Sequence, residues 1–464
     1  MDQESGWATD EFGSASLGNR ARVRRLVAVA RGCAQRPAGK ITQVFSNGAD
    51  REGTYRFLES KHVDAEAMLG AAHQAGATRC AKQRFVYVPI DMTSLNFTDT
   101  EDSKSLGMVG TRERHGHGFE VMTALAVSSD GTPQGIIGQK YWTRSRAPRP
   151  SKKQLKRRPT KEKETQHWLD VMAQARANLA LHAPSTKPWF QLDRAGDAWP
   201  LLVAGGRDEG CWFTTRAAWD RNVYAVGDKQ LHVWDSVLES EPLGSYVIDV
   251  ETSRHRSARR VVMQLRAVQV MLDLEDVGTN ERIAQNMWAV LASEDGSPPV
   301  GEKPLEWMLL TSFPVDGLES AGRVVLGYTQ RWRVEEFHKA WKTGACNVED
   351  SQLRDADHLL PWVIILASVA VRILRMTYFA RAHPNTSAAV EFTEREIRAV
   401  ATLSKSKGLA RGATPTMKQM TTWIAQLGGY IGTSSGGPPG ALVIARGLDR
   451  LQLAFQLLGA VDET

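Results

Sequence analysis

The chain has 464 residues, 42% of them hydrophobic, and its 58 Lys and Arg side chains outnumber 52 Asp and Glu side chains. This length and apolar content exclude a disordered chain and are typical of about three folded domains. The net charge of +6 and the isoelectric point of about 9.1 favour a polyanionic partner without establishing one.

The opening segment, MDQESGWATDEFG, is acidic and lacks an apolar core, which argues against a secretory signal. The cysteines are scattered without a CxxC pair, so the sequence predicts neither a disulfide framework nor a structural metal site: Cys33, Cys80, Cys211 and Cys346. We therefore expect a protein of the reducing cytoplasm.

The first 70 residues are predicted to be helical and basic. The stretch ASLGNRARVRRLVAVARGCAQ places Leu26, Val27 and Ala30 at helical spacing, with arginines around them. A small helical DNA-binding domain has this pattern, and so does any basic amphipathic helix. The pattern alone leaves both interpretations open.

An α/β order follows from residue 84. RFVYVPIDMTSLNF is predicted to be a strand, and FEVMTALAVSSDGTPQGIIGQKYWTR two strands joined by a turn at residues 130–133. A helix is expected in ETQHWLDVMAQARANLALHA and another strand in KPWFQLD. Strand, hairpin, helix and strand in this order are typical of an α/β fold.

Residues 141–164 concentrate positive charge, with ten basic residues against two acidic ones. This stretch fits either a solvated loop or a segment that binds a phosphate backbone with release of counterions.

From about residue 205 to 312 the chain is predicted to form strands, including NVYAV, LHVWDSV, GSYVIDV and RRVVMQLRAVQVML. Helices return in AGRVVLGYTQRWRVEEFHKAWK and in LLPWVIILASVAV, which is too short to span a bilayer comfortably and suits a buried helix. The last ninety residues are expected to be helical segments broken by loops.

Two of the predicted strands end in an aspartate, VYVPID at Asp91 and WFQLD at Asp193. Ligands and metals in α/β sheets lie at the carboxyl ends of strands. A single aspartate there is more often a helix cap or a turn residue, so each residue alone has two interpretations.

A third carboxylate lies in YTQRWRVEEFHKAWK. On a continuous helix, Glu335 shares a polar face with Tyr328, Arg331, Lys339 and Lys342, and Glu336 lies about 80° from Tyr328 as a structural charge. Ion pairs four residues apart would explain this face, and so would chemistry. Cleavage of a phosphodiester with two metal ions needs about three convergent carboxylates, which Asp91, Asp193 and Glu335 could supply.

The spacing Tyr328-x2-Arg331-x3-Glu335-x6-Lys342 resembles the Y-R-E-K signature of the bacterial insertion-sequence-four family of DDE transposases. Other similar stretches occur in the same order along the chain: GWATDEFGSASLG, EGTYRF, IDMTSL, DRAGD, KPLEWMLLTSFPV, VAVRIL and IAQLGG. The resemblance covers essentially the whole chain. It departs at Met92, where the family has Thr, and at Ala195, where it has Glu. In addition, NVYAVGDK puts one arginine contact to DNA in doubt.

The resemblance implies an α/β fold with a ribonuclease H-like core at residues 71–375 and a β-rich insertion at about 205–312. Flanking it are a helical DNA-binding domain at 1–70 and a helical dimerisation domain at 376–464. By position, Asp91, Asp193 and Glu335 are the catalytic residues and the ligands of two Mg²⁺ ions, which Mn²⁺ could replace. DNA contacts are implied for Tyr328, Arg331, Lys339, Lys342, Arg25, Arg56 and Trp307.

Trp307 stands where the family stacks a flipped base, and an ordinary strand-core tryptophan is the alternative. The implied activity is cut-and-paste transposition by a homodimer that binds double-stranded transposon ends and target DNA and forms hairpins, in the bacterial cytoplasm at the nucleoid and away from any membrane. Two alternatives remain. One is an end-binding inhibitor without catalysis, although no carboxylate is lost. The other is a metal-dependent nuclease without strand transfer.

Overall fold

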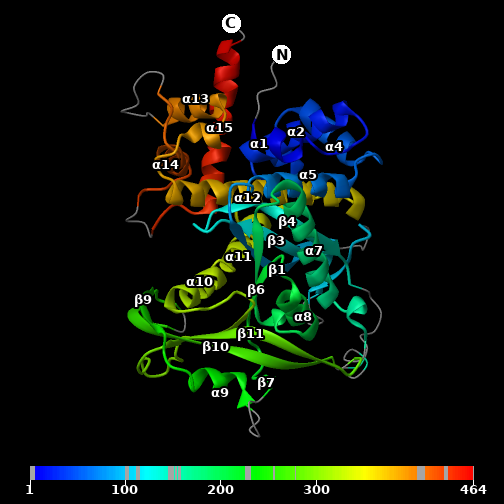
Figure 1. Cartoon of the computed structure of the whole chain (residues 1–464). Coiled ribbons are helices and arrows are strands. Elements are labelled where there is room, and N and C mark those ends of the chain that lie inside the picture. The colour runs from blue at the N-terminus through cyan, green and yellow to red at the C-terminus, as the bar shows by residue number, and fades with distance from the viewer. Residues whose placement is uncertain are drawn as a thin grey trace.

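The computed structural model of the chain describes residues 6–99, 104–110, 115–144, 151, 154, 158–224, 231–253, 256–276, 278–404, 413–432 and 437–462, with side chains as far as residue 451. A mixed β-sheet runs through its middle, and helices from both ends of the chain gather beyond one end of that sheet (Figure 1). The long helix α12 (Ala356–Ala382) lies between these helices and the sheet. The predicted α/β class with helical termini is confirmed.

The N-terminal region is helical, as its pattern predicts, with α1 (Trp7–Phe12), α2 (Arg20–Gln35), α3 (Ile41–Val44), α4 (Gly48–Leu58) and α5 (Ala65–Thr78). Helix α2 begins where it does because the side chain of Asn19 accepts the N–H of Arg22. Its buried stripe includes Leu26 and Ala30. The arginines left on the solvent side are Arg20, Arg24, Arg25 and Arg31.

The core of the sheet consists of β1 (Phe85–Phe97), β3 (His115–Val127), β4 (Pro133–Trp142), β5 (Lys187–Leu192) and β6 (Trp212–Arg216), with the short β2 (Gly107–Gly110) beside the start of β3. Strands β1, β3 and β4 are antiparallel, whereas β5 runs parallel to β1 and β6 parallel to β5. The predicted hairpin turn lies between β3 and β4, where Gly131 adopts a φ of 84°. Helix α7 (Thr165–His182) makes the crossover from β4 to β5, and α8 (Trp199–Arg207) the crossover from β5 to β6.

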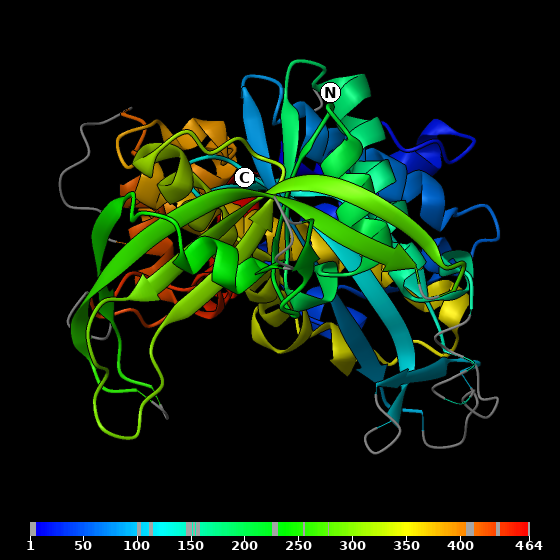
Figure 2. The same ribbon diagram turned by 60° about the horizontal axis from the view of Figure 1, so that its bottom comes forward.

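The β-rich segment after β6 extends the same sheet. It contains β7 (Asn222–Val223), β8 (Leu231–His232), β9 (Gly244–Val250), β10 (Arg259–Asp276), β11 (Glu281–Glu294) and β12 (Glu306–Thr311). Because β12 pairs with both β6 and β11, the long β10–β11 ribbon continues the core sheet and arches across the molecule (Figure 2). The strand predicted for LHVWDSV is wrong after His232, since Val233–Leu238 form helix α9, whose Val233 and Val237 are buried one turn apart.

The helix predicted over residues 321–342 is interrupted. Helix α10 (Leu318–Thr329) is followed by α11 (Trp332–Lys339) and by a π-helical turn, Ala340–Gly344. At the junction, Gln330 and Arg331 donate their N–H groups to carbonyls three residues back rather than four, which tightens the chain. The polar face predicted for one continuous helix therefore applies only within α10 and within α11, and not across the junction between them.

The C-terminal part is helical as expected, with α13 (Glu394–Leu403), α14 (Met417–Leu427) and α15 (Ala441–Asp462). Within the part of the chain that the structure describes, only α12 has the length and composition of a membrane span, and 89% of its most apolar stretch is buried in the protein. Helix α12 is thus the buried core helix that the sequence predicts.

Candidate functional site

Two aspartates lie side by side on neighbouring strands. Strand β5 pairs in parallel with β1, with Pro89 opposite Gln191, so the register carries Asp193 alongside Asp91 where β5 ends. The prediction that Asp91 also ends a strand is wrong, because β1 continues to Phe97 and pairs Asp91 with Thr123 of β3. Because β5 ends at Leu192 while β1 continues, Asp91 lies beside the carboxyl end of β5, where ligands bind in α/β sheets.

Each aspartate accepts a hydrogen bond from nearby backbone. The Oδ1 atom of Asp91 accepts the N–H of Met92 at 2.8 Å, and Oδ1 of Asp193 accepts the N–H of Ala195 at 2.8 Å. Asp193 thus also has the turn-forming role that the sequence left open, as the cap of the 3-10 turn Arg194–Gly196. These bonds leave other carboxylate oxygen atoms available in each residue.

Glu335 approaches the aspartates from helix α11. Its Oε1 atom accepts a hydrogen bond from Nη1 of Arg331 at 2.5 Å, and the same guanidinium nitrogen is 3.8 Å from Oδ2 of Asp91. Arg331 is buried, with 8% of its surface exposed, so its charge acts at short range on both carboxylates. The ion pair predicted between Arg331 and Glu335 is present, and Asp91 of β1 lies near the same guanidinium.

The carboxylates influence one another electrostatically. Burial, with contributions from the nearby negative charges of Asp193 and Glu335, raises the pKa of Asp91 to about 6 against the opposing effects of Met92 and Arg331. Such a shift on a carboxylate beside two others is typical of a functional site, although structural ion pairs also produce shifts. The three residues named from the sequence therefore meet in one region.

Carboxylate oxygens are the ligands that Mg²⁺ and Mn²⁺ prefer, but the three side chains do not converge on one point as they stand. In the described residues, no three His, Cys, Asp or Glu side chains stand close enough together to hold a metal ion. The guanidinium of Arg331, between Asp91 and Glu335, at present compensates part of their charge.

Tyr328 and Trp307 form the border of the site towards β12. Tyr328 is 4% exposed, and its ring meets that of Trp307 edge to face with centroids 5.4 Å apart. Trp307 is half-buried and borders an apolar cavity of about 390 Å³ between α10 and strands β9, β10 and β12. Other residues that line this cavity are Tyr246, Ile248, Met263, Leu305, Val325 and Leu326.

Lys342 of the signature and the nearby Lys339 lie differently. Lys342, in the π-helical turn, reaches β1, where Nζ donates to the carbonyl oxygen of Ser94 at 2.6 Å and lies 3.5 Å from the Glu349 carboxylate. Lys339 is exposed on α11. Lys342 is thus held against β1, whereas the side chain of Lys339 lies in solvent.

Glu336 is held away from the aspartates. Nη1 of Arg333 donates to it at 3.3 Å and the hydroxyl of Tyr378, on α12, donates to it at 2.6 Å. These contacts make Glu336 a structural charge between α11 and α12, as the sequence interpretation expected.

Sequence reasoning missed Arg216, the last residue of β6. Its Nη2 donates to the carbonyl oxygen of Glu306 at 2.9 Å, and its positive charge acts on the hydroxyl of Tyr328. Burial, and next the positive charge of Arg194, lower the pKa of Arg216. A strand that ends on a charged residue, WFTTR, is the pattern that identified Asp193, and it could have found Arg216 as well.

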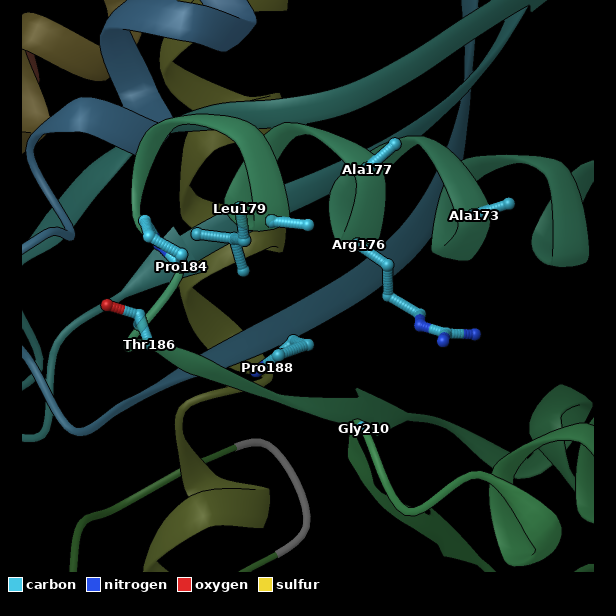
Figure 3. A pocket seen from close by; sticks show the side chains of 9 residues that line it. Ala173, Arg176, Ala177, Leu179, Pro184, Thr186, Pro188 and Gly210 are labelled. Carbon is cyan, nitrogen blue, oxygen red and sulfur yellow. The ribbon is translucent and has the colours of Figure 1, made fainter.

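Another cavity, of about 420 Å³, lies away from these residues, along α7 beside β5, and is lined mostly by alanine and proline (Figure 3). Its charged lining residue, Arg176, pairs with Asp208. With no carboxylate in its lining, this cavity offers nothing for cleavage chemistry.

Arg25 and Arg56 belong to the N-terminal helices. The guanidinium of Arg25 on α2 lies about 3 Å from where a Cβ on Gly53 of α4 would stand, and Arg56 lies one turn beyond Gly53. Both arginines are exposed, and Arg56 forms an ion pair with Glu52. The two side chains thus lie on neighbouring parts of α2 and α4.

The basic stretch 141–164 lies partly outside the described residues. At its start, Arg144 pairs with the buried Glu120 at 2.9 Å and with Glu164 at 2.6 Å. Both ends of the stretch are therefore anchored to each other and to β3.

Residues 4–63 match the transposase DNA-binding family. The matched residues include α1 to α4, with Arg25 and Arg56. Of the two interpretations of the basic N-terminal helices, the match favours DNA binding. DNA is thus a partner of this chain, and a domain of this kind supports a transposase.

Proposed function

We propose that the chain is a cut-and-paste DNA transposase of the insertion-sequence-four kind, similar to the Tn-five transposase. The observation that carries this proposal is the meeting of Asp91, Asp193 and Glu335 in a chain with an N-terminal transposase DNA-binding domain. Cleavage at DNA ends needs a domain that selects the end and carboxylates that can hold the cations which act on its phosphate.

The strand arrangement supports a ribonuclease H-like core. Three antiparallel strands, β1, β3 and β4, are joined on the other side of β1 by the parallel strands β5 and β6. In this proposal, the β-rich insertion expected at about residues 205–312 contains β7 to β11 and is bordered by β6 and β12, and α13 to α15 belong to the C-terminal dimerisation module.

Asp91, Asp193 and Glu335 would hold two Mg²⁺ ions, or Mn²⁺ in their place, since carboxylate oxygens are the ligands that these hard cations prefer. Bound there, the ions would activate water to nick one strand and then the freed 3′-OH to attack the other, giving a hairpin. Arg331 compensates part of the charge of Asp91 and Glu335. With cations bound to these carboxylates, its guanidinium would be available to a DNA phosphate.

The remaining signature residues would hold the DNA backbone around the cut. Tyr328 contacts Trp307 of β12, and Lys342 reaches from the π-helical turn to β1. The exposed Lys339 and the arginine of β6, Arg216, extend this positive rim. Phosphate contacts of this kind fix the position of the DNA and weaken as salt concentration rises.

Trp307 would stack a base flipped out of the end, with the adjacent apolar cavity as its receptacle. We expect Trp307→Ala to slow hairpin formation by roughly 5- to 150-fold, the effect of losing ~1–3 kcal/mol of base stacking. The first nick needs no such base rotation and should stay within about twofold of wild type. Trp307→Phe, which keeps a stacking surface, is the matched control.

Denaturing gels that separate nicked from hairpinned ends measure both steps for Trp307→Ala. Equal loss of nicking and hairpinning would assign Trp307 to the strand core instead.

A homodimer that bridges two ends is part of the proposal, as is action at the nucleoid in the bacterial cytoplasm. The alternatives are an end-binding inhibitor and a metal-dependent nuclease without strand transfer. The preserved carboxylates disfavour the first, and the transposase DNA-binding domain together with the C-terminal helices disfavours the second.

One assay separates these functions. The protein is incubated with Mg²⁺ and a labelled duplex that carries the inverted repeat flanking its own gene, beside an EDTA control. Hairpinned ends and products joined to a target plasmid are expected. Nicks that never join would identify the nuclease, and binding without any cleavage the inhibitor.

A further inference from the structure

A buried ion pair lies four residues after Asp193. The side chain of Asp197 is fully buried, and its Oδ1 atom accepts a hydrogen bond from Nε of Arg221 at 2.6 Å. Arg221 is itself mostly buried, with 19% of its side chain exposed. A buried charge pair of this kind is costly to break, because removal of one partner leaves the other uncompensated.

Asp197 also binds the backbone that follows β6. Its Oδ2 atom accepts the N–H groups of Ala218 at 2.7 Å and Trp219 at 3.0 Å. In return, Nη2 of Arg221 donates to the carbonyl oxygen of Asp197 at 2.7 Å. Four hydrogen bonds therefore tie one residue of the Asp193 turn to the segment by which the chain leaves the core sheet.

The same geometry excludes Asp197 as a metal ligand. Three donors occupy its two carboxylate oxygens, and no part of the side chain is exposed. Asp193 accepts one backbone N–H and is half-buried. Of the two aspartates in DRAGD, the one free to act on a substrate is Asp193.

The turn between Asp193 and Asp197 is tightly packed and has no room for a side chain at Gly196. A Cβ atom on Gly196 would come within 2.5 Å of Cβ of Leu192 and 2.6 Å of Oγ1 of Thr215. That hydroxyl of Thr215 in turn donates to the carbonyl oxygen of Asp193 at 2.6 Å. Strand β6 thus holds the start of the turn through Thr215, and the segment after β6 holds its end through Asp197.

Strand β6 also carries the opposite side of the site. The charge of Arg216, next to Thr215, acts on Tyr328, and β6 pairs with β12, the strand of Trp307. Movement of the turn relative to β6 would therefore change where Asp193 stands with respect to the residues proposed to hold the DNA.

We infer that Asp197 and Arg221 are positioning residues that fix the Asp193 carboxylate relative to β6 and the β-rich insertion. The inference rests on the proposed function. Under it, the pair sets the geometry of the metal ligands without touching metal or DNA, in the way that residues behind a metal ligand orient it. The competing possibility is that the pair stabilises the fold and nothing more.

The test compares Asp197→Asn with a matched buried pair outside the site. Asp197→Asn keeps the size of the side chain and one acceptor oxygen but removes the charge that faces Arg221. The control is Glu391→Gln, which breaks the 2.6 Å pair of Glu391 with Arg375 of α12, whose side chains are 7% and 12% exposed. Arg221→Lys keeps the charge and should have an intermediate effect.

Three measurements are made on each variant: Mn²⁺ binding followed by electron paramagnetic resonance, hydrogen exchange of residues 217–221 without metal, and nicking across a range of Mg²⁺ concentrations. For Asp197→Asn we expect Mn²⁺ affinity weaker by about tenfold and exchange faster by about tenfold. Nicking should be lost at low Mg²⁺ and partly recovered at high Mg²⁺, while binding to the DNA end stays at the wild-type level. Glu391→Gln should change none of these.

If Asp197→Asn and Glu391→Gln lower the melting temperature alike and also change Mn²⁺ affinity alike, the pair is structural and the inference is wrong. If Asp197→Asn does not fold, Arg221→Lys decides by the same criterion. A wild-type protein that binds the end but neither binds Mn²⁺ nor cleaves would overturn the proposed function, and this inference with it.

Discussion

Glu335→Ala is expected to abolish end cleavage, and Glu336→Ala to retain it. The two residues are neighbours, yet Glu335 turns to Arg331 and Asp91, whereas Glu336 turns to Arg333 and Tyr378. Removal of a proposed metal ligand should lower cleavage on the order of 10³-fold, since the charge that develops on the phosphate is then left without stabilisation. Loss of the Glu336 hydrogen bonds should cost only about 1 kcal/mol of folding free energy.

Cleavage is measured as the rate of product formation on a labelled end at saturating Mg²⁺, and end binding by gel shift for both variants. Binding should stay at the wild-type level, because the matched DNA-binding domain, residues 4–63, contains neither glutamate. A lower melting temperature with normal cleavage is expected for Glu336→Ala. If instead Glu336→Ala is the inactive variant, the assignment of Glu335 is wrong.

Asp91→Asn is expected to inactivate the protein and, without metal, to stabilise it at pH 7.5. Folding raises the pKa of this carboxyl from 3.8 to about 6, mainly by burial, so the folded state binds the proton more tightly than the unfolded state. The free energy of unfolding therefore falls as pH rises from about 4 to about 6, and stays lowered above that range. Because asparagine is never charged, the free energy of unfolding of this variant does not fall over that pH range through ionisation at this position.

The expected gain is about 1–3 kcal/mol at pH 7.5, since one pKa unit corresponds to ~1.4 kcal/mol and the side chain keeps some contact with water. Asparagine also retains the acceptor for the N–H of Met92. Urea unfolding in EDTA at pH 7.5 and pH 4 measures the difference between variant and wild type, which should vanish at pH 4. A difference that is the same at both pH values would show that ionisation of Asp91 is not its cause.

In the wild type, the same proton should compete with metal. Below about pH 6, a protonated Asp91 offers no carboxylate, so Mn²⁺ binding is expected to weaken as pH falls through that value. We therefore expect Asp91→Asn to raise stability without metal and to weaken metal binding, whereas the ionised Asp91 of the wild type lowers the first and supports the second.

Much of the fold follows from local sequence pattern. Aromatic and β-branched residues around a turn signal predict β1, β3 and β4, and the turn before Pro133 lies where its residues place it. The buried stripe of α2 follows helical spacing. The pairing of Arg331 with Glu335 could likewise be predicted, because residues four apart on a helix face each other.

Predictions failed where non-local packing outweighs local pattern. The sequence suggested that a strand ends at Asp91, but β3 continues to pair with β1 as far as Phe97. The sequence predicts a strand in LHVWDSV, yet Val233 and Val237 lie on the buried face of a helix. The signature helix breaks at Gln330, so a uniform turn of about 100° per residue could not carry the face of Tyr328 on to Lys342.

The sequence by itself determined which side chains are candidates, since residue type and spacing are local properties: Asp91, Asp193, Glu335 and the basic residues around them. Only the tertiary structure decided that Asp193 stands beside Asp91, because that depends on the register of two parallel strands about a hundred residues apart in the chain. It also decided that Asp197 is occupied by Ala218, Trp219 and Arg221, which leaves Asp193 free. Register and hydrogen-bond saturation arise from contacts between distant segments, and no local pattern encodes them.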